Sequence, residues 1–161
     1  MASKFEIEMV LKSDVEKVWK NFKELTISFP KALPNYYEGI DVVEGDGLSV
    51  GTIFITTLKP TDLNPGGSRT KERIDVIDEE NKIFSYSYIE GEILKHYKNL
   101  KGTANMSSSK SSSSSKSKSG GTNFKFIVEF DKANAQVPDP HFFKDFLLLV
   151  FNDLDAYLLN A

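Results

Sequence analysis

Side chains that could act as acids, bases, nucleophiles or metal ligands are few in this chain and widely spaced. The 161 residues include no cysteine and only two histidines, His96 and His141. Without cysteine there can be no disulfide, thiolate nucleophile or cysteine-ligated zinc. The histidines lie in different predicted elements and have no partner at metal-ligand spacing, so we predict no metal site. Each histidine is either an ordinary surface or half-buried residue or a general base.

The tripeptide Lys71-Glu72-Arg73 offers a second kind of chemistry. It lies in a predicted strand, where neighbouring side chains point to opposite faces, so either Glu72 or Arg73 must point inward. A carboxyl group among apolar side chains has a raised pKa and can act as an acid or a base. The alternative is an ion pair between Glu72 and a lysine or arginine of a neighbouring strand.

The glycine-rich segment Glu44-Gly45-Asp46-Gly47 could be a phosphate-binding loop or a hairpin turn. It lacks the Gly-Lys-Ser/Thr ending of a nucleotide-binding P-loop, and its two carboxylates would repel phosphate. We therefore predict a hairpin turn, with a nucleotide site as the alternative.

Patterns of apolar residues predict the elements that must position these groups. In chain order they are a strand over 4–12, short helices over 15–22 and 27–33, strands over 39–43, 50–58, 70–77, 83–90, 93–106 and 124–130, and a helix over 139–159. Ser13 and Asp139 are the predicted N-caps, because Glu16 completes a capping box with Ser13 and Pro140 suits the first helical position. Sequential strands joined by short turns form an antiparallel meander, and a helix about 30 Å long would lie across its concave side. The predicted fold class is α+β.

A low-complexity tract interrupts this pattern near the end of the meander. Residues 107–119 hold ten serines and three lysines and are followed by two glycines. Such a segment cannot bury apolar surface, so we predict a disordered loop over 107–121 inserted into a single domain that spans residues 1–161.

Charge and hydropathy exclude several partners. The net charge is −3, and without the three lysines of the serine tract it would be −6. A body of this charge repels nucleic acid and anionic membranes. The longest apolar run, Phe146 to Phe151, is far too short to span a membrane, and the N-terminal residues do not resemble a signal peptide. We predict a cytoplasmic protein with no nucleic-acid partner and no membrane span.

Apolar side chains on one face of the strands and of the last helix form the largest candidate site. The helix is apolar over a wider face than one sheet contact requires, which indicates a cavity beside it. The inward-facing candidates are Phe54, Leu58, Phe84, Tyr86, Tyr88, Phe126, Val128, Phe143, Phe146, Leu147 and Val150, with Tyr97 as a further candidate. Such a set forms either an ordinary core or the wall of an apolar pocket, in which tyrosine hydroxyls would orient a ligand.

Three stretches of the chain, in order, carry a family resemblance. They are the glycine-rich segment Glu44-Gly45-Asp46-Gly47-Leu48-Ser49-Val50-Gly51-Thr52-Ile53, the pair Thr70-Lys71-Glu72-Arg73-Ile74-Asp75 and Ile89-Glu90-Gly91-Glu92, and the closing Asp155-Ala156-Tyr157-Leu158-Leu159. Together they resemble the major latex protein branch of the birch-pollen-allergen (Bet v I, START-like) superfamily of plants. The resemblance covers nearly the whole chain except the serine tract.

This resemblance implies a seven-stranded curved antiparallel sheet wrapped around the C-terminal helix, two short helices after the first strand, and an internal hydrophobic cavity. In such relatives the cavity holds apolar metabolites. Some relatives catalyse steps of alkaloid or iridoid pathways, and others are linked to defence. The resemblance also implies that Glu72 faces the cavity, which makes Glu72 and Tyr86 the candidate catalytic residues.

One group of relatives, the norcoclaurine synthases, uses a lysine that falls on Lys125 of this chain. Alternation with Phe124 and Phe126 directs Lys125 outward. The tyrosine and glutamate of that group fall near Lys101 and Thr103, which cannot do the same work. We therefore do not predict that reaction here.

Two functions remain. The first is a cofactor-free carrier of small hydrophobic plant metabolites, monomeric or weakly dimeric, with a link to defence or specialised metabolism. The second is a cofactor-free cyclase, isomerase or lyase of an iridoid or alkaloid pathway that works in the same cavity. The acidic body and the lack of a catalytic histidine pair disfavour a third, a ribonuclease or nucleic-acid binder.

Overall fold

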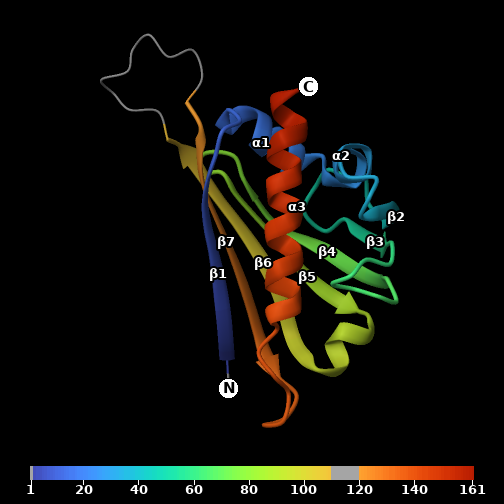
Figure 1. The fold of residues 1–161 in the computed structure, drawn as a ribbon. Helices are drawn as coiled ribbons and strands as arrows, with labels where there is room; N and C mark the ends of the chain where they lie inside the picture. The colour runs from blue at the N-terminus through green and yellow to red at the C-terminus, as the bar shows by residue number, and fades with distance from the viewer. Residues whose placement is uncertain (1, 110–119) are drawn as a thin grey trace.

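The computed structural model describes residues 2–109 and 120–161, which form one antiparallel sheet, three α-helices and a short 3-10 helix (Figure 1). In chain order the elements are β1 (Ala2–Leu11), α1 (Val15–Lys23), α2 (Leu25–Ala32), β2 (Tyr37–Glu44), β3 (Ile53–Leu58), β4 (Ser68–Asp78), β5 (Ile83–Glu90), the 3-10 helix η1 (Glu92–Lys95), β6 (Tyr97–Ser108), β7 (Thr122–Lys132) and α3 (His141–Leu159).

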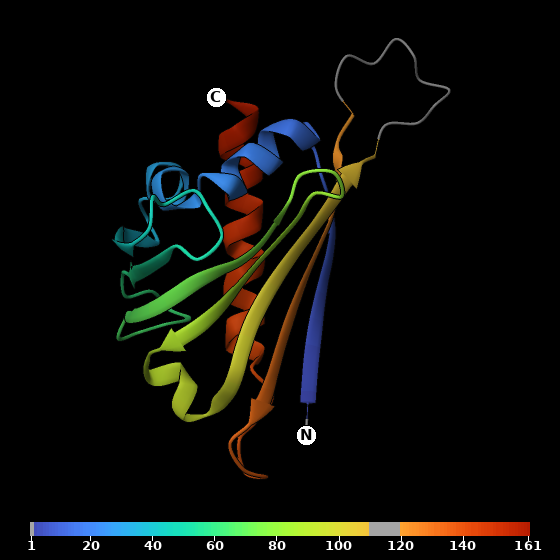
Figure 2. The ribbon, with the colours of Figure 1, turned by 180° about the vertical axis from the view of Figure 1, so that it is seen from behind.

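The sheet runs in the order β1-β7-β6-β5-β4-β3-β2, with every neighbouring pair antiparallel. The strands β2 to β7 form a meander, and β1 adds to its far edge beside β7. The helix α3 lies across one face of the curved sheet (Figure 1). Seen from behind, the sheet lies in front of α3 (Figure 2). The helices α1 and α2 lie near the C-terminal end of α3. The predicted α+β architecture, a seven-stranded sheet wrapped around the C-terminal helix, is confirmed.

One end of the space between sheet and helix is filled by aromatic side chains. Phe151 of α3 packs against Phe124 and Phe126 of β7, with ring centroids 4.8 Å and 5.0 Å apart. Phe22 of α1 closes the group, 5.6 Å from Phe124. Buried rings at these distances combine a large apolar contact area with favourable ring geometry, so this cluster fixes α1 and α3 against the sheet.

A glycine in β6 makes room for two aromatic rings on the concave face. A Cβ atom at Gly102 would lie 2.7 Å from the Phe126 ring and 3.1 Å from the Tyr86 ring. Real Cβ atoms do not approach carbon as closely as the first of these distances. The bare backbone at Gly102 therefore allows Tyr86 and Phe126, from the strands on either side, to lean over β6.

The N-cap of α1 differs from the prediction. The cap is Asp14, whose carboxylate accepts a hydrogen bond from the Glu16 amide at 3.1 Å. The amide of Ser13 instead donates to the carboxylate of Asp155, 142 residues further along the chain, at 2.9 Å, as does the amide of Lys12. The predicted cap at Ser13 is wrong, because both its amide and its hydroxyl donate to Asp155 of α3 instead of serving α1.

The predicted cap at Asp139 is also wrong. Pro140 is the N-cap of α3 and makes no side-chain cap hydrogen bond, while the Asp139 carboxylate pairs with Lys132 of β7 at 2.6 Å. The predicted strand over 93–106 is a 3-10 turn followed by β6. Gly91 has φ +148°, and the chain leaves β5 there before η1 begins.

The serine tract begins inside a strand. Ser107 and Ser108 belong to β6, and the Ser109 amide donates to the Gly121 carbonyl at 2.9 Å. The remainder of the predicted loop, residues 110–119, lies outside the described residues.

Candidate functional site

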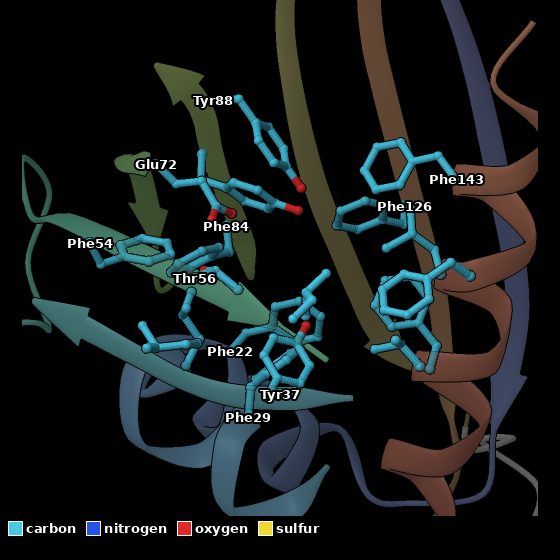
Figure 3. Close-up of a pocket in the computed structure, with 18 residues that line it drawn as sticks. Phe22, Phe29, Tyr37, Phe54, Thr56, Glu72, Phe84, Tyr88, Phe126 and Phe143 are labelled. Atoms are coloured by element: carbon cyan, nitrogen blue, oxygen red, sulfur yellow. The ribbon is translucent and has the colours of Figure 1, made fainter. Parts of the chain in front are cut away.

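A hollow in two compartments lies between the concave face of the sheet and α3. The inner compartment has a volume of about 70 Å³ and includes side chains from α1 and α2 in its wall (Figure 3). The outer compartment has a volume of about 490 Å³ and is bounded by η1 and the segment that leads into α3. Both are lined by Leu58, Tyr88, Phe143 and Phe146, so these four side chains form the boundary between neighbouring parts of one hollow.

Regular spacing along two elements brings much of the wall together. In β5, Phe84, Tyr86 and Tyr88 occupy alternate positions and therefore share the concave face. In α3 the lining residues recur at three- and four-residue intervals, which places them on the side of the helix that faces the sheet. These helical residues are Phe143, Phe146, Leu147, Val150 and Phe151.

Among the described residues, one carboxyl group lines the inner compartment. Glu72 is 6% exposed and lies on the concave face of β4 with Thr70 and Ile74, as the resemblance implied. The cations beside it in sequence point elsewhere: Arg73 pairs with Asp75 at 2.8 Å, and Lys71 pairs with Glu90 at 2.9 Å. In the part of the chain that the structure describes, no lysine, arginine or histidine forms an ion pair with Glu72, so the alternative of an ion pair is wrong.

Hydroxyl groups are the only hydrogen-bond donors that Glu72 has among the described residues. The Thr70 Oγ1 atom donates to Glu72 Oε2 at 3.0 Å, and Thr56 of β3 provides a second hydroxyl. Burial raises the pKa of Glu72 to about 7, and the two threonine hydroxyls oppose that rise only in part. Near neutral pH this carboxyl group is therefore poised between its neutral and its charged form.

Three tyrosines share the inner compartment with Glu72. Burial raises the pKa values of Tyr37, Tyr86 and Tyr88 well above that of an exposed tyrosine, and the nearby Glu72 charge adds to the rise. The phenol groups therefore stay neutral and can donate hydrogen bonds. The rings of Tyr86 and Tyr88 lie 5.6 Å apart and both line the inner compartment, into which the Tyr88 hydroxyl points (Figure 3).

Most of the predicted site residues lie together around this hollow. Those that line the inner compartment are Phe54, Leu58, Glu72, Phe84, Tyr86, Tyr88, Phe126, Phe143, Phe146, Leu147 and Val150. Tyr97 lines only the outer compartment, where its hydroxyl donates to the Pro138 carbonyl at 2.8 Å. Val128 is 1% exposed and lines neither compartment, because the inner face is filled at that point.

Seven lining residues of the inner compartment were not predicted. They are Phe22, Leu25, Phe29, Tyr37, Ile40, Thr56 and Phe151. Three of them carried a usable signal: Phe22 lies on the apolar stripe of α1, Thr56 alternates with Phe54 and Leu58, and Phe151 follows Leu147 at helical spacing in α3. The other four depend on where α2 and β2 pack in space, which sequence spacing does not encode.

Other candidate chemistry does not converge on the hollow. Lys125 points away from it and pairs with Glu6 on the convex face at 3.2 Å, as alternation predicted. Of the two histidines, only His96 lies at the hollow, on the wall of the outer compartment. Over residues 2–109 and 120–161 no group of three or more histidine, aspartate and glutamate side chains could hold a metal ion.

The glycine-rich segment is a turn between β2 and β3, which pair as a hairpin. The Asp46 carboxylate accepts hydrogen bonds from the amides of Leu48 and Ser49 at 2.8 Å and 2.9 Å. These are the amides that a phosphate would need, and the chain's own carboxylate already occupies them. The predicted hairpin turn is confirmed.

The helices within the described ranges do not suit a bilayer. None of them is both long enough and apolar enough to cross one.

A curved antiparallel sheet that holds a long C-terminal helix over an internal hollow defines the helix-grip class of proteins. The family model of the pathogenesis-related protein Bet v 1 family matches residues 1–161. The chain therefore belongs to the Bet v 1 family. MLP-like protein 423 of Arabidopsis thaliana is 38% identical over 154 residues, which cover 96% of this chain and 92% of the relative. The resemblance to the major latex protein branch is thus confirmed.

Solved structures agree with this assignment. The ginseng major latex-like protein 151 of Panax ginseng superposes with a TM-score of 0.84 at 25% identity, covering 98% of both chains. Norcoclaurine synthase of Thalictrum flavum, solved with dopamine and hydroxybenzaldehyde, superposes with a TM-score of 0.71 at 20% identity, covering 99% of this chain and 87% of the synthase. The second comparison shows a shared fold alone.

Proposed function

We propose that this protein binds a small hydrophobic plant metabolite in the hollow between α3 and the sheet. The observation that carries the proposal is the outer compartment, about 490 Å³ in volume and walled mainly by apolar side chains. A cavity of this size and lining suits a small apolar ligand, with a few polar groups to orient it. Each Å² of apolar surface removed from water contributes about 25 cal/mol to affinity.

A thermal-shift screen of apolar metabolites tests this proposal. A ligand present at about 100 times its dissociation constant stabilises the folded state by about 2.7 kcal/mol, which corresponds to a rise of several degrees in Tm. Leu58→Phe adds bulk at the boundary of the two compartments and should reduce the shift. The matched control is Val10→Phe, because Val10 is 72% exposed and remote from the hollow. If no apolar compound raises the Tm of the unmodified protein, the proposal is wrong.

A second candidate function rests on Glu72. A buried carboxyl group without a charge partner, with its pKa raised to about 7, can give or take a proton at neutral pH. The protein would then be a cofactor-free cyclase, isomerase or lyase that holds a reactive intermediate beside Glu72, with Tyr86 as a neutral hydrogen-bond donor. Product profiles of such an intermediate, with and without protein, test this activity. Glu72→Gln should return the profile to that of the spontaneous reaction, whereas Glu90→Gln, on the exposed side of β5, should not.

The cellular setting is part of the same proposal. We place the carrier in the cytoplasm as a monomer or weak dimer, in defence or specialised metabolism. A fluorescent fusion in plant cells would check the location, and sedimentation in the analytical ultracentrifuge would check the oligomeric state.

A further inference from the structure

The inner compartment has an electrostatic character that apolar burial alone does not explain. Within the described chain, Glu72 is the only one of its lining residues that carries charge at neutral pH, and no lysine, arginine or histidine lines it. The ionised carboxylate is shielded from bulk water and has no counter-ion among the described residues. A buried charge without a partner is costly, so a cation supplied from outside would be strongly favoured at this place.

Aromatic rings flank the carboxylate on both sides. Phe54 of β3 and Tyr88 of β5 are the cross-strand partners of Glu72, and such partners have Cβ atoms about 5 Å apart. Tyr86 lies diagonally across from Glu72, opposite Ile74. The faces of aromatic rings attract cations, most strongly where water is excluded. A carboxylate among such rings is suited to an organic ammonium group.

We propose that the inner compartment binds the protonated amine of an amphiphilic ligand, with Glu72 as its counter-ion and Phe54, Tyr86 and Tyr88 as its aromatic surround. The inference rests on the proposed function and names the chemical class of the ligand. The inner compartment, at about 70 Å³, is large enough for a small polar head group but not for a whole metabolite. The apolar remainder of the ligand lies in the outer compartment, beyond the boundary formed by Leu58, Tyr88, Phe143 and Phe146.

Other ligand classes suit the inner compartment less well. An anionic head group would be repelled by Glu72. A neutral alcohol could accept or donate a hydrogen bond, but it would leave the carboxylate charge uncompensated. The outer compartment differs, because most of its wall is apolar and the cation Arg69 lies on it beside Glu92 and His96. It therefore suits the apolar end of such a ligand, while the inner compartment suits the ammonium group.

The binding should depend on pH in a defined way. The titratable groups that face Glu72 are Tyr37 of β2 and Tyr86 and Tyr88 of β5, and all three stay neutral below about pH 9 because their pKa values are raised. The linings from α1, α2, β3 and α3 include no titratable side chain among the described residues. Glu72 alone therefore sets the pH dependence, with a pKa of about 7. An amine that binds only the ionised carboxylate loses affinity about tenfold between pH 8 and pH 6.

Isothermal titration calorimetry with naphthylethylamine and its isosteric alcohol, naphthylethanol, tests the inference. At pH 8 the amine should bind at least tenfold more tightly than the alcohol, and this preference should be about tenfold smaller at pH 6. Glu72→Gln should abolish the preference at pH 8, whereas Glu90→Gln, an exposed glutamate on the next strand, should retain it.

The outcomes separate the two proposals. If amine and alcohol bind equally at pH 8, or if the amine preference survives in Glu72→Gln, the amine assignment is overturned while the carrier function stands. If neither compound binds but uncharged apolar metabolites raise the Tm, the amine assignment again fails alone. If no compound of any class binds, both proposals fail. The pH comparison uses the unmodified protein, so it holds even if a variant folds poorly.

Discussion

Replacing Glu72 by glutamine should stabilise the protein at alkaline pH and leave it unchanged at acid pH. A glutamate side chain in the unfolded chain has its ordinary pKa of 4.5, and burial raises the pKa of Glu72 to about 7 in the folded protein. Between these two values the folded state holds a proton that the unfolded state has released. The unfolded state then binds fewer protons, so the free energy of unfolding falls as pH rises.

The size of the effect follows from the two pKa values. Each pH unit between them corresponds to about 1.4 kcal/mol, so ionisation of Glu72 lowers the free energy of unfolding by about 3 kcal/mol above pH 7. Below pH 4.5 the carboxyl group is neutral in both states, and this loss is absent. A glutamine side chain has nearly the same shape and can still accept hydrogen bonds from Thr56 and Thr70, but it never carries the charge.

Urea unfolding at pH 5, 6, 7 and 8, followed by the fluorescence of Trp19, measures the effect. Trp19 is the single tryptophan of the chain and is 1% exposed, so its emission reports on loss of the core. The difference between Glu72→Gln and the unmodified protein should grow by about 2–3 kcal/mol across this range. Glu90→Gln is the matched control, because Glu90 pairs with Lys71 at the surface and should show no such growth. Parallel stability curves for Glu72→Gln and the unmodified protein would refute the assignment of Glu72 as a buried, unpaired carboxylate.

Two further substitutions test the supports of the hollow. Gly102→Ala places a methyl group 2.7 Å from the Phe126 ring, so it should lower the free energy of unfolding in urea by about 1–3 kcal/mol and reduce ligand-induced thermal shifts. The control is Gly66→Ala, which has no atom within 4 Å of the new methyl group and should leave the thermal shifts unchanged. Asp155→Ala removes the acceptor of the Lys12 and Ser13 amides and should lower the free energy of unfolding by about 1–3 kcal/mol. Asp145→Ala, on the exposed side of the same helix, should lower it by less than about half a kcal/mol. Equal losses for the two variants would contradict the role given to Asp155.

The elements of the fold were predictable because each is encoded by local periodicity. Alternation in Phe84, Tyr86 and Tyr88 fixed the inner face of β5, and alternation in Phe124 and Phe126 directed Lys125 outward. The helix caps were not predictable in this way. Ser13 has a good capping sequence, but Asp155 of α3 takes its amide as a partner from 142 residues away. Competition from a distant acceptor leaves no trace in the local pattern.

The hollow itself was less predictable than its wall. Phe126 and Val128 occupy equivalent alternate positions on β7, yet only Phe126 lines the inner compartment. The difference depends on how far α3 stands from the sheet at each point, which is a property of packing between elements. Residues such as Tyr37 and Phe29 enter the wall for the same reason, because α2 and β2 close one side of it.

The state of Glu72 shows where sequence reasoning ends and what the structure adds. The sequence allowed an inward carboxylate with or without a lysine or arginine partner on a neighbouring strand, and the choice depended on which side chains of other strands reach Glu72. Among the described residues no lysine, arginine or histidine lines the inner compartment, so Glu72 has only threonine hydroxyls as partners there. Because its ionisation costs about 3 kcal/mol of stability at neutral pH, the needs of folding do not explain a glutamate at this position.

A ligand would explain it, and the two proposals for Glu72 differ in what the ligand does to its charge. A protonated amine stabilises the ionised carboxylate and so lowers the pKa of Glu72 on binding. Acid–base catalysis instead requires a pKa that stays near 7 while the intermediate is bound. Carbon NMR of the labelled carboxyl group can follow the pKa of Glu72 as ligand saturates the protein. A pKa that falls indicates a binding site for amines, and a pKa that stays near 7 indicates a site of proton transfer.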